Sequence, residues 1–76
     1  MSVLLYSTPS CAYCRLAKDY FKTNGVSFTE YNVASDQRKA EEMVRKSGQM
    51  GVPVIDIDGS IIIGFNKPDI ERALRR

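Results

Sequence analysis

Histidine and tryptophan are absent from this 76-residue sequence, and cysteine occurs only twice. A small secreted domain held by disulfides usually carries about four to eight cysteines, so that class is excluded. One chain also lacks the Cys and His ligands that a mononuclear structural zinc site requires, and we expect no metal site within it. In a reducing compartment, a close cysteine pair is more often catalytic or metal-binding than structural.

Long hydrophobic runs are also missing. No apolar stretch approaches the roughly 18 residues needed to cross a bilayer, so we expect no membrane partner. The first residues lack the basic stretch, apolar region and cleavage site of a signal peptide, and we expect a cytoplasmic protein. With 43% hydrophobic residues at this length, one folded domain over residues 1–76 is expected.

Neither sign of charge dominates the sequence. Eleven Lys and Arg residues against nine Asp and Glu residues give a net charge of +2. The basic residues occur in scattered pairs, which usually form solvated helix faces rather than a nucleic-acid patch. We therefore expect no nucleic-acid partner.

Hydrophobic periodicity predicts three helices. Apolar residues recur at helical spacing between positions 13 and 21, and the Asn-Gly pair at 24–25 is a good stop for that helix. Ser35 is the expected N-cap of a second helix, which Gly48 ends. Pro68 lies near the start of the last helix.

Four strands are predicted over residues 3–6, 26–33, 52–57 and 60–63. The Asp-Gly pair at 58–59 predicts a tight antiparallel hairpin, and the first β-α-β unit predicts two parallel strands. The order is β-α-β-α-β-β-α. This is an α/β fold in which three helices flank a mixed four-stranded sheet.

The cysteine pair lies where the first predicted strand gives way to the first helix. Cys11 and Cys14 are nearly one helical turn apart, so their sulfurs can lie on one side and form a disulfide. Unpaired N–H groups at a helix N-terminus favour an anionic sulfur, and Arg15 or Lys18 can add positive charge. We expect Cys11 to be the exposed attacking thiolate and the more buried Cys14 to be the resolving thiol.

Other interpretations of the pair stay open at this point. A structural disulfide across so short a loop would add little stability. A zinc site shared with the cysteine pair of a second chain requires symmetric assembly, and two core cysteines can also be adjacent by chance. The C-x-x-C spacing beside a β-α-β pattern favours a redox pair.

Three motifs together resemble the glutaredoxin family of the thioredoxin fold. Residues 6–14 (YSTPSCAYC) are similar to its strand-to-CPYC opening, residues 51–53 (GVP) to its Thr-Val-Pro turn, and Gly64 to its Gly-Gly element. The resemblance implies one glutaredoxin-like domain over residues 1–76 that performs reversible thiol–disulfide exchange. It also implies a cis Val52-Pro53 bond against the cysteines, no tightly bound cofactor, and glutathione as the reductant. We expect a monomer that acts on disulfide-containing proteins.

The same resemblance implies a binding groove for glutathione or a protein substrate. Its residues in this chain are Tyr13, Val52, Pro53, Gly64, Phe65 and Asn66. Backbone N–H groups of the last two can cap a carboxylate at a helix N-terminus, although the Phe65 side chain can equally be core.

Several positions depart from the family pattern. Ala12 replaces the usual proline, Thr8 replaces a common lysine, and Asn66 and Lys67 replace acidic or small polar residues that hold the γ-glutamyl group. These changes weaken the expected contacts with glutathione.

Residues 64–69 (GFNKPD) instead resemble the small redoxins that serve ribonucleotide reductase. Those proteins are reduced by thioredoxin reductase, so this enzyme is the alternative electron donor. A second alternative is an iron–sulfur cluster held through Cys11 in a glutathione-bridged dimer.

Overall fold

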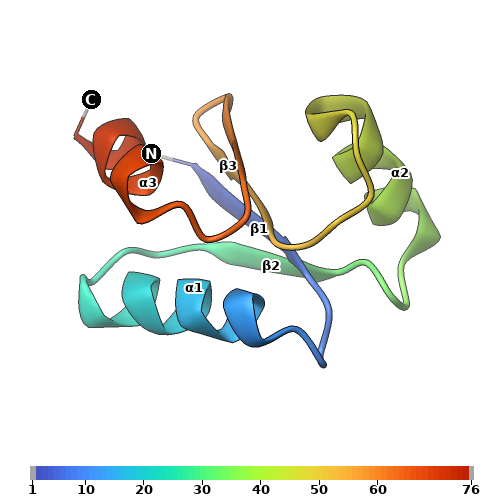
Figure 1. The fold of residues 1–76 in the computed structure, drawn as a ribbon, viewed down its shortest axis with the longest axis horizontal. Helices are drawn as coiled ribbons and strands as arrows, with labels where there is room; N and C mark the ends of the chain where they lie inside the picture. Colours follow the sequence, from blue (N-terminus) through green and yellow to red (C-terminus); the bar gives the residue numbers. More distant parts are fainter. Residues whose placement is uncertain (1, 76) are drawn as a thin grey trace.

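The computed structural model describes residues 2–75. Its elements are β1 (Val3–Ser7), α1 (Ala12–Thr23), β2 (Thr29–Asn32), α2 (Gln37–Ser47), β3 (Val54–Ile57), β4 (Ser60–Ile63) and α3 (Lys67–Leu74) (Figure 1). The predicted α/β class and the order β-α-β-α-β-β-α are confirmed. None of the helices between residues 2 and 75 is long and apolar enough to cross a membrane.

The four strands form one mixed sheet in the order β2-β1-β3-β4. Strand β1 runs parallel to β2 and antiparallel to β3, and β3 runs antiparallel to β4. The hairpin between β3 and β4 turns at Asp58 and Gly59, which both have positive φ, the conformation that such tight turns require. The predicted parallel and antiparallel pairs are therefore confirmed.

Alternating side chains of the sheet divide the core into two layers. Leu5 and Ile55 face one layer, where they pack with Ala17 and Phe21 of α1 and with residues of α3. Tyr6 faces the opposite layer and packs with Met43 of α2. Successive strand residues point to opposite faces, so β1 contributes side chains to both layers. The strand order places β1 in the interior of the sheet, between β2 and β3.

Several element boundaries differ from the sequence prediction. Strand β1 extends to Ser7, one residue beyond its predicted end. The N-cap of α2 is Asp36 rather than Ser35, because the Asp36 carboxylate accepts the Lys39 backbone N–H over 3.1 Å. The Ser35 hydroxyl instead donates to the Asn32 backbone oxygen in the preceding turn. Strand β2 begins at Thr29 and β3 at Val54, so both strands are shorter than predicted.

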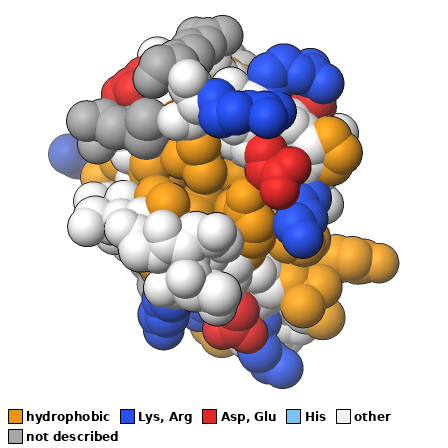
Figure 2. Space-filling model, turned by 90° about the vertical axis from the view of Figure 1, so that its left-hand side faces the viewer, with side chains coloured by type: hydrophobic (Ala, Val, Ile, Leu, Met, Phe, Trp, Pro, Cys, Tyr) orange, Lys and Arg blue, Asp and Glu red, His pale blue; other side chains and the backbone are white. Residues whose placement is uncertain are grey.

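Charged side chains surround the apolar core. On the face that Figure 2 shows, Lys and Arg side chains are interspersed with Asp and Glu side chains around an apolar centre. The mixed charges agree with the small net charge of the sequence.

Candidate active site

The site begins where the chain leaves β1 and enters α1. Cys11 is the N-cap of α1, and its Sγ atom accepts the backbone N–H of Cys14 over 3.1 Å. The first donors of a helix have no partner within the helix, and Cys11 sulfur satisfies one of them. An N–H donated to sulfur at the positive end of a helix dipole stabilises negative charge on that sulfur.

Cys14 lies one turn into the helix and has only 1% of its surface exposed, whereas Cys11 is half-buried. Both are free thiols. Burial, together with a hydrogen bond to Cys11, raises the pKa of the Cys14 thiol well above its ordinary value. The two cysteines therefore have different environments: Cys11 lies at the N-terminus of α1, and Cys14 lies inside the fold.

The turn before β3 lies against the cysteines. The Cys11 thiol donates a long hydrogen bond to the Val52 backbone oxygen, with 3.8 Å between Sγ and oxygen. The Val52-Pro53 bond is cis, as the family resemblance implies, and Pro53 is buried. Gly64 joins the same turn because its N–H donates to the Pro53 oxygen over 2.8 Å.

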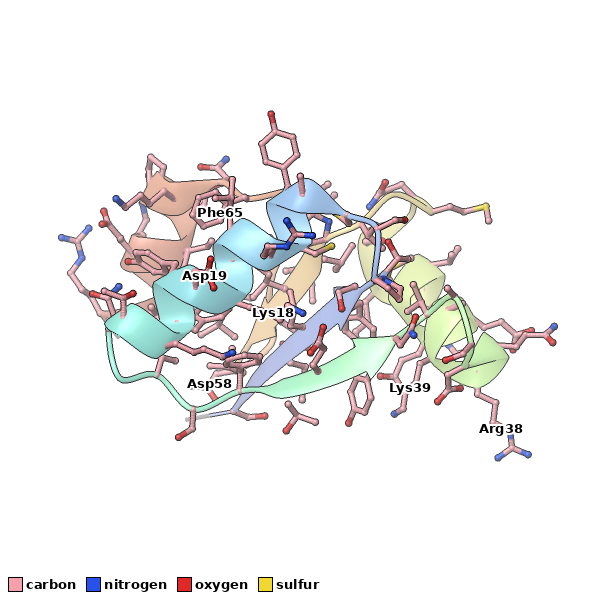
Figure 3. All side chains as sticks on the ribbon, turned by 90° about the horizontal axis from the view of Figure 1, so that it is seen from below. Lys18, Asp19, Arg38, Lys39, Asp58 and Phe65 are labelled. Atoms are coloured by element: carbon pink, nitrogen blue, oxygen red, sulfur yellow. The ribbon has the colours of Figure 1, made fainter. Side chains whose placement is uncertain are left out.

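The remaining predicted groove residues lie around this centre in different ways. Tyr13, which lies between the two cysteines in the sequence, has a side chain that is 63% exposed. Phe65 packs edge-on against Tyr20 of α1, with ring centroids 6.1 Å apart, and contacts the core, as its position between α1 and α3 in Figure 3 indicates. Asn66 is the N-cap of α3, and its side-chain oxygen accepts the Asp69 N–H. Both of these side chains thus have structural contacts of their own.

A polar cluster beside the site was not predicted. The Ser7 hydroxyl donates to Glu30 Oε2 over 2.6 Å, and Lys18 Nζ lies 3.1 Å from the same oxygen. The residues come from β1, β2 and α1, so the parallel pairing of β1 with β2 and the packing of α1 on the sheet bring them together. The helical spacing of Lys18 from Cys14 was the one sequence signal for this cluster.

Exposed apolar residues near the turn were also missed. Met50, two residues before Val52, is highly exposed and lies with Ala40 and Val44 of α2 around a shallow apolar hollow. A lone methionine in a loop gives no periodic signal from which this hollow can be predicted. Within residues 2–75, no group of three or more His, Cys, Asp or Glu side chains is placed to hold a metal ion.

The fold and the C-x-x-C pair at the start of α1 define a thiol redoxin of the thioredoxin fold. The Glutaredoxin family model matches residues 3–62, and the chain belongs to the glutaredoxin family. Membership of this family implies thiol–disulfide oxidoreductase activity.

Two curated relatives are similar in sequence. A glutaredoxin-like 8.6 kDa protein in the rubredoxin operon of Clostridium pasteurianum is 46% identical over 74 residues, covering 97% of this chain and 99% of its own length. Glutaredoxin 3 of Escherichia coli is 40% identical over 63 residues, covering 83% of this chain and 76% of its own length.

Among solved structures, the glutaredoxin-like protein NrdH-redoxin from Escherichia coli has the same fold. It superposes with a TM-score of 0.85 at 26% identity, covering 95% of this chain and 93% of that chain. NrdH-redoxin has a thioredoxin-like activity profile. The chain is therefore similar both to a glutaredoxin and to a glutaredoxin-like redoxin with a thioredoxin-like activity profile.

Proposed function

We propose that this protein is a dithiol oxidoreductase that reduces protein disulfides and glutathione mixed disulfides. The observation that carries the proposal is the unequal placement of the two thiols. Cys11 caps the helix at the surface with an N–H donated to its sulfur, and Cys14 lies buried one turn later. A reducing compartment such as the cytoplasm suits this role because it keeps both cysteines reduced.

The reaction has two exchange steps. The Cys11 thiolate attacks a substrate disulfide R–S–S–R′, forming a Cys11–S–S–R mixed disulfide and releasing R′–S⁻, which takes a proton from water. Cys14 then loses its proton and attacks the Cys11 sulfur, which forms the Cys11–Cys14 disulfide and releases R–S⁻. Two electrons have passed from the cysteine pair to the substrate, and an external dithiol or two glutathione molecules return them.

The turn beside Cys11 is proposed to hold the substrate. The Val52 backbone lies at the Cys11 sulfur, so an extended peptide or glutathione can form main-chain hydrogen bonds there. Tyr13, which is exposed and lies between the two cysteines in sequence, is proposed to supply an apolar contact for the substrate. Pro53 and Gly64 complete this turn through the hydrogen bond from the Gly64 N–H to the Pro53 oxygen. The side chains of Phe65 and Asn66 have structural contacts of their own, so only their backbone N–H groups are proposed to meet a substrate carboxylate.

Glutathione is the electron donor that we propose first. Similarity to glutaredoxin 3 supports it. A specific observation also favours thioredoxin reductase, because residues 64–69 resemble the redoxins that use this enzyme and the chain is similar to NrdH-redoxin. Consumption of NADPH in two coupled assays separates these donors: one contains glutathione and glutathione reductase, and the other contains thioredoxin reductase alone.

Cysteine substitutions test the proposed roles. We expect Cys11→Ser to abolish reduction of every disulfide, and Cys14→Ser to keep only the reduction of glutathione mixed disulfides, which needs one thiol. Reduction of an insulin disulfide and of a glutathionylated peptide measures both activities. Full activity of Cys11→Ser would contradict the proposal.

A further inference from the structure

The second exchange step places a demand on Cys14 that the helix N-terminus does not meet. Its thiol is buried, and burial raises its pKa, yet it must lose a proton before it attacks the mixed disulfide. The sequence has no histidine to remove this proton or to stabilise the resulting charge. A fixed positive charge on the same helix face is one means of favouring the thiolate.

Lys18 supplies such a charge. It follows Cys14 by four residues in α1, so both side chains lie on one helix face, and long helical side chains lean towards the N-terminus. The Thr8 backbone N–H and, more weakly, the Lys18 ammonium act on the Cys14 sulfur in the direction that lowers its pKa.

The Lys18 side chain is held in place rather than free in solvent. Its Nζ atom lies 3.1 Å from Glu30 Oε2, and the side chains of Lys18 and Glu30 are 30% and 36% exposed. The buried Ser7 hydroxyl donates to the same Glu30 oxygen over 2.6 Å. Figure 3 shows Lys18 directed from α1 towards the strands.

The charged and titratable groups around Cys14 come from two elements. Cys11 is the N-cap of α1, Lys18 belongs to α1, and Glu30 of β2 pairs with Lys18. The hydrogen bond from Ser7 holds the pKa of Glu30 below its ordinary value, and Lys18 adds to this effect, so Glu30 stays charged at neutral pH. The ion pair is therefore present at neutral pH.

We propose that Lys18, oriented by Glu30 and Ser7, stabilises the Cys14 thiolate that resolves the mixed disulfide. This inference rests on the proposed function. In the step, the Cys14 proton passes to water, the Cys14 sulfur bonds to the Cys11 sulfur, and the Cys11–S–S–R bond breaks. The released R–S⁻ takes up a proton, so protons balance and the electron pair leaves with R. Glu30 and Ser7 are positioning residues that act through Lys18.

A neutral disulfide, 2,2′-dipyridyl disulfide, separates the two steps in a stopped-flow experiment. In excess, it reacts with Cys11 in a phase whose rate increases with probe concentration, and each protein releases one thiopyridone. Attack by Cys14 then releases a second thiopyridone at a rate that does not depend on probe concentration. The first phase reports the proposed function, and the second phase alone reports this inference.

We expect Lys18→Met to slow the second phase about two- to fivefold at pH 8, the effect of one partly exposed charge, and to shift its pH profile upward. Lys18→Arg should restore most of the rate. Lys22→Met, which makes the same charge change on the same helix, should leave both phases unchanged. A second phase and pH profile in Lys18→Met equal to those of Lys22→Met would overturn the inference, whereas loss of the first phase in the wild type would overturn the proposed function instead.

Discussion

The backbone N–H of Cys14 donates a hydrogen bond to the Sγ atom of Cys11 over 3.1 Å. The resolving cysteine of the proposed mechanism thus stabilises charge on the attacking cysteine through its backbone, while its own side chain stays inside the fold. One helical turn therefore makes two chemically identical residues unequal. The predictions below test the contacts around this turn.

Ala12 is the first residue of α1, where the glutaredoxin motif has proline. We expect Ala12→Pro to raise the free energy of unfolding by about 0.4–1 kcal/mol, because proline restricts the unfolded chain and its missing N–H is not needed at this position. Urea unfolding measures the change. The matched control is Ala17→Pro in the buried interior of α1, which should lower stability by about 3 kcal/mol or more. A destabilised Ala12→Pro variant would contradict this prediction.

Phe65 packs against Tyr20 and the core, so its side chain is expected to contribute mainly to stability. Phe65→Ala should lower the free energy of unfolding by about 1–3 kcal/mol and change kcat/KM for a small disulfide less than about twofold. Tyr13→Ala provides the contrast, because Tyr13 is exposed: stability should change by no more than about 0.5 kcal/mol while KM rises. The opposite pattern in the two variants would place Phe65 in the substrate groove.

Lys46 connects α2 to the sheet. It donates to Asp56 over 2.7 Å and to the Tyr6 hydroxyl over 2.8 Å, and the Asp56 side chain is only 12% exposed. Burial opposes the charge of Lys46, but these hydrogen bonds raise the pKa of Lys46 overall. Lys46→Met should therefore lower the free energy of unfolding by about 2–3 kcal/mol, since a carboxylate is left buried without its cation.

Arg72 is the matched control for Lys46. It pairs with Asp69 at 3.3 Å, but its side chain is 75% exposed, so Arg72→Met should cost less than about 0.5 kcal/mol. Urea unfolding measures the stability of both variants. Equal losses of stability in Lys46→Met and Arg72→Met would show that the burial of Asp56 does not determine the effect of losing Lys46.

Acid should destabilise the fold through two carboxylates. The hydrogen bond from Tyr6, with help from Lys39, holds the pKa of Glu42 below its ordinary value, and Ser7 does the same for Glu30. Groups with a lowered folded-state pKa contribute stability that is complete above their unfolded pKa of about 4.3 and is lost as pH falls through the folded value. The urea midpoint should thus be level near neutral pH and fall below about pH 4.5. Glu42→Gln should reduce this acid-dependent fall, and an unchanged fall would exclude Glu42 as its source.

Local signals in the sequence predict much of this fold. The Asp58-Gly59 pair specifies the hairpin because its residues tolerate positive φ, and the helical period of apolar residues locates α1. The predicted N-cap of α2 was one residue too early, because Ser35 and Asp36 both suit that position locally. Only the competing hydrogen bond from Ser35 to Asn32 decides between them.

Contacts between distant elements are the part that local patterns do not specify. The spacing of Cys11 and Cys14 predicts their proximity, but nothing in it indicates that Ser7, Lys18 and Glu30 share one oxygen. That cluster depends on the register of β1 with β2, in which Leu5 lies opposite Glu30. Likewise, the sequence around Phe65 is compatible with a side chain that lines a groove and with one that packs in the core. Only the observed packing against Tyr20 distinguishes the two positions.

Competitive alkylation tests the central claim most directly. The reduced protein is treated near neutral pH with less than one equivalent of iodoacetamide, and peptide mass spectrometry gives the fraction of each cysteine modified. The account predicts that Cys11 carries nearly all of the label, because its sulfur is accessible at the helix N-terminus whereas Cys14 is buried as a thiol. Equal labelling of both cysteines, or preferential labelling of Cys14, would contradict it.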